Sequence, residues 1–147
     1  MRKQNLVIVT CLILIIILII RLGAYFINYG IAIKANWGIW LPRGFKEIYS
    51  TDSGPSFFGD GERYHVFYYR KGLKEKELEK FNYSKNTSLE TEVENILESL
   101  QVPDNDRPDF TEEYYWYYQD DKDDPRDKLY IIYFVRYNKM YIVEEFY

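Results

Sequence analysis

The amino-terminal part of the chain is a continuous apolar run with basic residues on both sides. Leu6–Ile20 contains fifteen residues and no charge, and it lies between Arg2-Lys3 and Arg21. At about 1.5 Å per residue, this run is shorter than a hydrocarbon core of roughly 30 Å. The apolar residues after Arg21 supply the missing length, because an arginine side chain can extend to the lipid headgroups. The pattern predicts a transmembrane helix within an anchor of residues 1–28.

A cleaved secretory signal is the main alternative, since it also has a basic start and an apolar centre. No clear small-x-small cleavage site follows the run, which favours a retained signal anchor. The amino-terminal amine, Arg2 and Lys3 precede the run, and by the positive-inside rule they favour a cytoplasmic N-terminus. We therefore expect a single-pass protein of the cell membrane whose C-terminal domain lies outside the cytoplasm.

After a connector of residues 29–40, residues 41–147 are enough for one compact domain. Alternating or continuous apolar and aromatic positions, separated by turn formers, predict five strands in this part. The run Leu129–Val135 is apolar throughout, which is typical of a central strand covered on both faces. The expected strands are 45–49, 63–69, 113–119, 129–136 and 140–146, with a tight hairpin at Asn138-Lys139 between the last two.

Between the second and third strands the hydrophobic period changes from two to that of a helix. Five apolar residues fall on one helical face, and Thr87 with Glu90 has the spacing of a capping box. A charged segment at 73–81 is compatible with a further helix. The apolar face consists of Leu89, Val93, Ile96, Leu97 and Leu100. The predicted fold class is α+β, a small antiparallel ββαβββ sheet packed on one main helix after the transmembrane helix.

Charge excludes some partners. After Arg21 the chain has 16 Lys or Arg and 23 Asp or Glu, a net charge of −7. Such an acidic domain is repelled by phosphate backbones, so nucleic acid is not expected as a partner. The single cysteine, Cys11, lies in the apolar run, and no phosphate loop or zinc spacing is present. We expect no cofactor, no metal and no enzymatic activity.

The loop Ser53–Glu62 is the first candidate binding site. Its glycines allow backbone to approach a ligand closely, and Phe57 and Phe58 place large apolar rings in a turn. Asp60 and Glu62 are the candidate polar contacts. The alternative is a long hairpin connection whose two phenylalanines fold back onto the core.

A tyrosine-rich strand is the second candidate. Strand alternation directs Tyr115 and Tyr117 to one face and their neighbours to the other. An exposed aromatic face binds peptides or sugar rings, whereas the alternative is cross-strand packing in the core.

Two further constellations favour simpler explanations. The acidic loop 120–127 lacks the spacing of a calcium-binding loop, and Lys122 and Arg126 offset part of its charge, so a solvated hairpin loop is expected. His65 with Ser56 and Asp60 has the residue types of a hydrolytic triad, but no nucleophile elbow accompanies them.

Leu41-Pro42, Tyr49 and the run SGPSFFGDGERY at 53–64 resemble small single-pass, membrane-anchored proteins of Gram-positive bacteria whose function is uncharacterised. The resemblance covers the anchor and the first hairpin. It implies a protein of the bacterial envelope, but no reaction and no site residue.

The sequence thus predicts a membrane-anchored, non-enzymatic binding module of the bacterial envelope with a protein or peptide partner. The alternative function is a small immunity or inhibitor protein that neutralises a basic toxin at the membrane by charge complementarity.

The anchor gives the first testable prediction. Detergent should release the protein from membranes, whereas high salt or an alkaline wash should leave it there, because the attachment is hydrophobic. The measurement is immunoblotting of pellet and supernatant after each treatment. Release by the alkaline wash alone would show that no segment crosses the bilayer.

Overall fold

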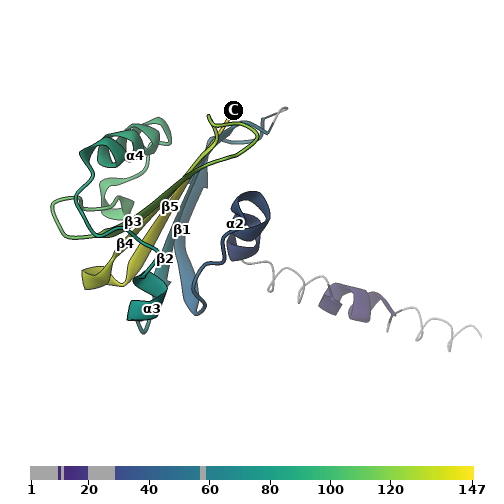
Figure 1. The fold of residues 1–147 in the computed structure, drawn as a ribbon. Coiled ribbons are helices and arrows are strands. Elements are labelled where there is room, and N and C mark those ends of the chain that lie inside the picture. Colours follow the sequence, from purple (N-terminus) through teal and green to yellow (C-terminus); the bar gives the residue numbers. More distant parts are fainter. Residues whose placement is uncertain (1–9, 11, 20–28, 57–58) are drawn as a thin grey trace, which may run out of the picture. The chain divides into compact units, whose positions relative to one another are not determined.

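The chain divides into two compact units, Met1–Leu41 and Pro42–Tyr147. The computed structural model in Figure 1 describes residues 10, 12–19, 29–56 and 59–147.

In the first unit, residues 12–19 are helical and their Leu and Ile side chains are 49–61% exposed. Within the described part of the chain, no helix is long and apolar enough to cross a membrane. The rest of the predicted anchor, residues 1–9, 11 and 20–28, lies outside the described residues.

The predicted connector contains a helix, α2 (Tyr29–Trp37), which its sequence pattern did not predict. Ile33 and Trp37, four residues apart, are buried on one side of it. The helix ends at Trp37, and the following residue, Gly38, adopts a φ of 72° and donates its N–H to the Lys34 carbonyl at 3.0 Å. A left-handed residue after the last turn is the usual place for glycine, because other residues meet steric resistance there.

The second unit is an α+β domain with a five-stranded antiparallel sheet, as predicted. The strand order is β1-β2-β5-β4-β3, so β1 and β3 form the two edges and β5 the centre (Figure 1). The strands are β1 (Phe45–Asp52), β2 (Gly61–Tyr69), β3 (Tyr115–Asp120), β4 (Lys128–Phe134) and β5 (Lys139–Phe146).

The bounds of the five strands and of the helix at 73–81 differ from the predicted ones by up to three residues. Helix α3 is short, Glu75–Leu78, because the segment around it has few apolar positions to bury. Strand β4 ends at Phe134 and not at residue 136, since a 3₁₀ turn, η2 (Val135–Tyr137), follows it. Asn138, at a φ of 51°, completes a longer connection than the predicted two-residue hairpin.

The inner strands bury side chains on both faces of the sheet. Each residue from Leu129 to Phe134 is at most 1% exposed, which confirms the expectation of a strand covered on both faces for these residues, whereas Val135, the last residue of the predicted run, is 52% exposed. The β4–β5 register pairs Tyr130 with Val143 on one face and Ile131 with Ile142 on the other. The alternate faces are therefore separate apolar layers.

Helix α4 (Thr87–Ser99) packs on the first of these faces (Figure 1). Its apolar stripe joins one hydrophobic cluster with strand residues that include Tyr64, Ile132 and Val143. The stripe consists of Leu89, Val93, Ile96 and Leu97, with Leu100 packed beside it, as the sequence predicts.

The start of α4 corrects the prediction of a Thr87–Glu90 capping box. Asn86 is the N-cap, and its side-chain oxygen accepts a hydrogen bond from the Leu89 N–H at 3.1 Å. The Asn86 N–H donates to the Tyr114 hydroxyl at 2.9 Å, and that hydroxyl donates to the Glu90 carboxylate at 2.5 Å. Tyr114 lies just before β3, so its hydroxyl links that point of the chain to the start of α4. No local sequence pattern indicates this contact. Burial, with this bond to Glu90, raises the pKa of Tyr114 to about 12.

Replacing Tyr114 by Phe should lower the free energy of unfolding by about 1–3 kcal/mol, because it leaves the Asn86 N–H and the Glu90 carboxylate without this partner. Chemical denaturation of the purified full chain in detergent measures the loss. Tyr83→Phe is the matched control, since it removes the hydroxyl of a tyrosine that is 56% exposed and should cost less than about 0.5 kcal/mol. Equal losses would show that the helix start does not depend on Tyr114.

Candidate functional site

The segment between α3 and α4 runs beside the first residues of β3. Asn82 and Trp116 exchange both backbone hydrogen bonds, at 2.8 and 2.9 Å, as an isolated antiparallel bridge. The Trp116 indole N–H also donates to the Ser84 carbonyl at 2.9 Å. These three bonds fix the position of residues 82–84 against the sheet edge.

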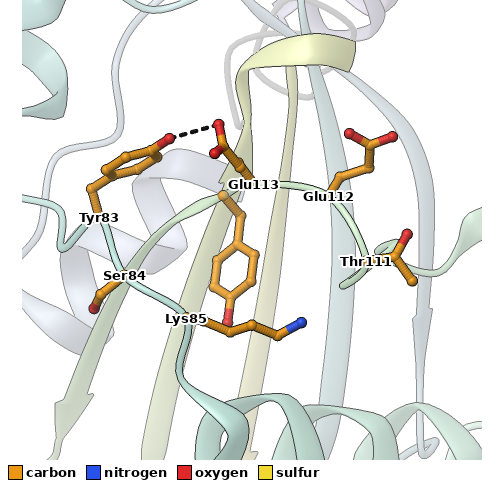
Figure 2. Close-up of a pocket in the computed structure, with 7 residues that line it drawn as sticks. Tyr83, Ser84, Lys85, Thr111, Glu112 and Glu113 are labelled. Carbon is orange, nitrogen blue, oxygen red and sulfur yellow. Dashed lines mark hydrogen bonds between the residues drawn. The ribbon is translucent and has the colours of Figure 1, made fainter.

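Beyond this bridge the surface is hollowed. A pocket of about 300 Å³ is lined by Tyr83, Ser84 and Lys85 on one side and Thr111, Glu112, Glu113 and Tyr114 on the other (Figure 2). A second hollow of about 450 Å³ shares Tyr83, Glu112 and Glu113 and adds Tyr115, Val135 and Arg136. We call the two together the Tyr83 groove.

Aromatic rings form much of the groove wall. The Tyr83 ring is 56% exposed, and its centroid lies 4.7 Å from that of Tyr115. Tyr83 points its hydroxyl toward Glu113 and donates to it at 2.7 Å (Figure 2). That hydrogen bond raises the pKa of Tyr83, since it holds the phenol in its protonated form.

Some of the charged side chains around the groove form ion pairs and others do not. Arg136 forms an ion pair with Glu112, and this contact raises the Arg136 pKa. Lys85 donates from its ammonium group to the Phe110 carbonyl at 3.1 Å. Over the described residues, Glu113 has no ion pair, and its carboxylate accepts from the neutral hydroxyl of Tyr83. Glu113 is thus an exposed carboxylate beside the exposed ring of Tyr83 and the half-buried ring of Tyr115.

This arrangement suits a side chain that carries both an apolar stem and a positive charge. Aromatic faces attract cations and pack against aliphatic stems, and a carboxylate accepts charge-assisted hydrogen bonds. The volume is that of a site for one or two side chains or a small ligand.

The structure places one of the predicted site residues in this groove. Tyr115 lines it, whereas Tyr117 lies further along β3, with its ring 6.3 Å from that of Phe81 and its hydroxyl bonded to Gln119. Both side chains are half-buried, so they form neither the fully exposed aromatic face nor the fully buried core packing considered for this strand.

The Ser53–Glu62 loop lies at the other edge of the sheet, between β1 and β2, so it is not part of the Tyr83 groove. Asp60 accepts a hydrogen bond from Ser56, and the Glu62 N–H donates to the Ser53 hydroxyl at 2.9 Å. The loop borders its own hollow of about 420 Å³. Phe57 and Phe58 lie outside the described residues.

Sequence reasoning missed Tyr83, Lys85 and Glu113. They come from two connecting segments that are distant in sequence and are joined by tertiary hydrogen bonds, among them the Asn82–Trp116 bridge and the Trp116–Ser84 bond. The one available signal was compositional, since residues 81–83 (FNY) place two aromatic residues in an otherwise charged linker.

The acidic loop uses its carboxylates locally. Asp121 accepts from the N–H of Asp123 at 2.7 Å, and Asp124 pairs with Arg126 at 2.6 Å, which lowers the Asp124 pKa to about 2. Asp127 accepts from the Tyr147 N–H at 2.8 Å. In the described part of the chain, no group of three or more His, Cys, Asp or Glu could hold a metal ion.

A comparison with known proteins found no matching family model, no matching curated protein and no matching solved structure. The resemblance to small anchored proteins of Gram-positive bacteria thus stays an expectation.

The single histidine gives a pH prediction. His65 lies on β2 and its Nδ1 is 2.5 Å from the Glu47 carboxylate. Burial lowers the pKa of His65 and outweighs the opposite effect of Glu47, so the ring is neutral at pH 7 and donates from Nδ1. An NMR titration of the full chain in detergent should place its midpoint below 6.5, and Glu47→Gln should lower it further.

The same shift couples to stability. The folded protein binds this proton less readily than the unfolded chain, so the contribution of His65 is complete above about pH 6.5 and is lost as the pH falls through the folded pKa. A midpoint above 6.5 would show that the ion pair with Glu47 outweighs burial.

Proposed function

We propose that this chain is a membrane-anchored, non-enzymatic binding module whose C-terminal domain binds a protein or peptide partner through the Tyr83 groove. The observation that carries the proposal is Glu113, an exposed carboxylate bonded to Tyr83 and flanked by the rings of Tyr83 and Tyr115, which lie 4.7 Å apart and are tilted by 33°. Such a site favours an arginine or lysine side chain of the partner.

The charge of the whole domain supports a cationic partner. Residues 42–147 contain 15 Lys or Arg and 23 Asp or Glu, a net charge of −8. A field of this sign attracts basic proteins and accelerates their association. In contrast, it repels the phosphates of nucleic acid.

The location belongs to the same proposal. Residues 12–19 form a helix of exposed Leu and Ile side chains, the kind of surface that lipid covers. Together with the basic residues on both sides of the apolar run, this supports a single-pass anchor in the cell membrane of a bacterium, with the N-terminus cytoplasmic and the domain outside.

A second candidate function is an immunity or inhibitor protein whose partner is a basic toxin. The net charge of −8 favours it, because charge complementarity often drives the recognition of basic proteins by small acidic inhibitors. Loss of protection against a toxin from the same cells on deletion of this protein would distinguish it from a general binding module.

The groove proposal can be tested with a labelled GRGRGR peptide and the full chain in nonionic detergent. Tyr83→Ala should weaken binding about fivefold, because it removes a ring that contacts the cation. Glu113→Gln should weaken it to a similar extent. Fluorescence anisotropy measures the affinities, and a GEGEGE peptide should not bind.

Tyr147→Ala is the matched control. Tyr147 is 59% exposed and donates to Glu145 at 2.8 Å, so it resembles Tyr83 in exposure and bonding but lies outside the groove. Equal weakening by Tyr83→Ala and Tyr147→Ala would mean that the peptide responds to overall charge, and the groove would not be the site.

A further inference from the structure

The two edges of the sheet differ in how they are protected against pairing with another chain. Edge strands expose backbone donors and acceptors, and proteins usually block them with bulges or charges. Strand β1 has an irregularity between Glu47 and Tyr49 that leaves Ile48 out of register. In β3 the register with β4 is continuous from Tyr115 to Asp120, without a bulge.

The outward groups of β3 can be assigned from the Asn82 bridge. Trp116 directs its N–H and carbonyl away from β4, because both are bonded to Asn82. In an antiparallel pair this direction alternates, so Tyr118 and Asp120 also direct their backbone groups outward. Among the described residues, these four outward groups have no backbone hydrogen bond. The bridge therefore fills the first position of an edge whose next two positions are open.

The side chains at these positions are aromatic and acidic. Tyr118 is 38% exposed, with its ring centroid 5.3 Å from that of Tyr130, and it donates its hydroxyl to Asp120. Burial is the largest cause of its raised pKa, and Asp120, Glu92 and Glu145 add to the rise, so the local field is negative. Lys128 contacts Glu92 at 3.2 Å and Glu145 at 3.9 Å and is the nearby cation that offsets them.

We propose that the edge at Tyr118–Asp120 accepts an extended cationic segment of a partner protein as a sixth strand. Backbone bonds to Tyr118 and Asp120 supply the affinity, and alternate lysine or arginine side chains lie over the Tyr118 ring beside Asp120. This site is separate from the Tyr83 groove and differs from it in mode, because it binds main chain.

A second copy of this chain fits the edge less well. Two domains of net charge −8 repel each other, and antiparallel self-pairing about Tyr118 would place Asp120 of one copy opposite Trp116 of the other. The outward groups of Trp116 are already bonded to Asn82. Charge and occupancy thus both favour a basic peptide.

The test uses a labelled KTKTKT peptide and the same peptide N-methylated at every residue, which keeps the charge but removes the backbone donors. The full chain in nonionic detergent should bind the methylated peptide about tenfold more weakly, since each lost hydrogen bond contributes to affinity. Binding of the two peptides within twofold of each other, or no binding of KTKTKT, would overturn the proposal.

Two substitutions locate the edge. Tyr118→Pro removes the outward N–H and should weaken KTKTKT binding about tenfold, while Tyr118→Ala keeps the backbone and should weaken it only about twofold to threefold. Because the outward N–H has no ladder partner, the proline variant should fold; if it does not, the peptide comparison on the unmodified chain still decides.

The controls separate this site from the groove and from self-association. The groove also accepts lysine side chains, so the peptide comparison is repeated in the Tyr83→Ala variant, where N-methylation of KTKTKT should still weaken binding about tenfold. This readout does not depend on the groove, so a failure of the groove proposal does not affect this one. Sedimentation velocity on the unmodified chain and Tyr118→Pro tests the second-copy alternative. Self-association that the proline abolishes, without peptide binding, would overturn the proposal in favour of a dimer.

Discussion

The second unit depends on one constraint, the double-sided burial of the central strands. Strands β4 and β5 bury apolar side chains on both faces, so the domain needs cover above and below its sheet. Helix α4 supplies this cover on one face through its stripe of Leu, Val and Ile. The edge strands β1 and β3, in contrast, each pair with a single neighbouring strand, and both proposed binding sites lie beside β3.

The same burial explains how a loop-derived groove can be rigid. Tyr114, the residue just before β3, is buried in the cluster beneath α4. Its hydroxyl accepts a hydrogen bond from the N–H of Asn86 at the start of that helix. In the same connecting segment, Asn82 is bonded to Trp116 through the backbone. The groove walls are thus held at both ends by a packed core, which reduces the entropy lost on binding.

The sequence predicts the elements that depend on hydrophobic period and composition. It does not predict contacts between segments that are distant in sequence. The strands and the α4 stripe follow from local pattern, since burial imposes a period of two or of 3.6. The observed helix cap is Asn86 and not the predicted Thr87–Glu90 capping box. The tertiary hydrogen bond between the Asn86 N–H and Tyr114 favours Asn86 at this position. The Tyr83 groove was not predictable for the same reason: the Asn82–Trp116 bridge spans 34 positions of sequence and leaves no local signal.

A recurring contact links packing to the proposed binding. Tyrosine hydroxyls donate to carboxylates in the pairs Tyr83–Glu113, Tyr114–Glu90, Tyr118–Asp120, Tyr130–Glu92 and Tyr147–Glu145. A phenol satisfies a carboxylate without neutralising it, and donation from Tyr130 lowers the pKa of Glu92. The domain can therefore order many acidic side chains on aromatic surface and remain strongly negative. Glu92 and Glu145 also contact Lys128, whereas Glu113 and Asp120 form no ion pair with the described residues. The proposed cationic partner would therefore gain an ion pair at the exposed pairs Tyr83–Glu113 and Tyr118–Asp120 without displacing a cation of the domain itself.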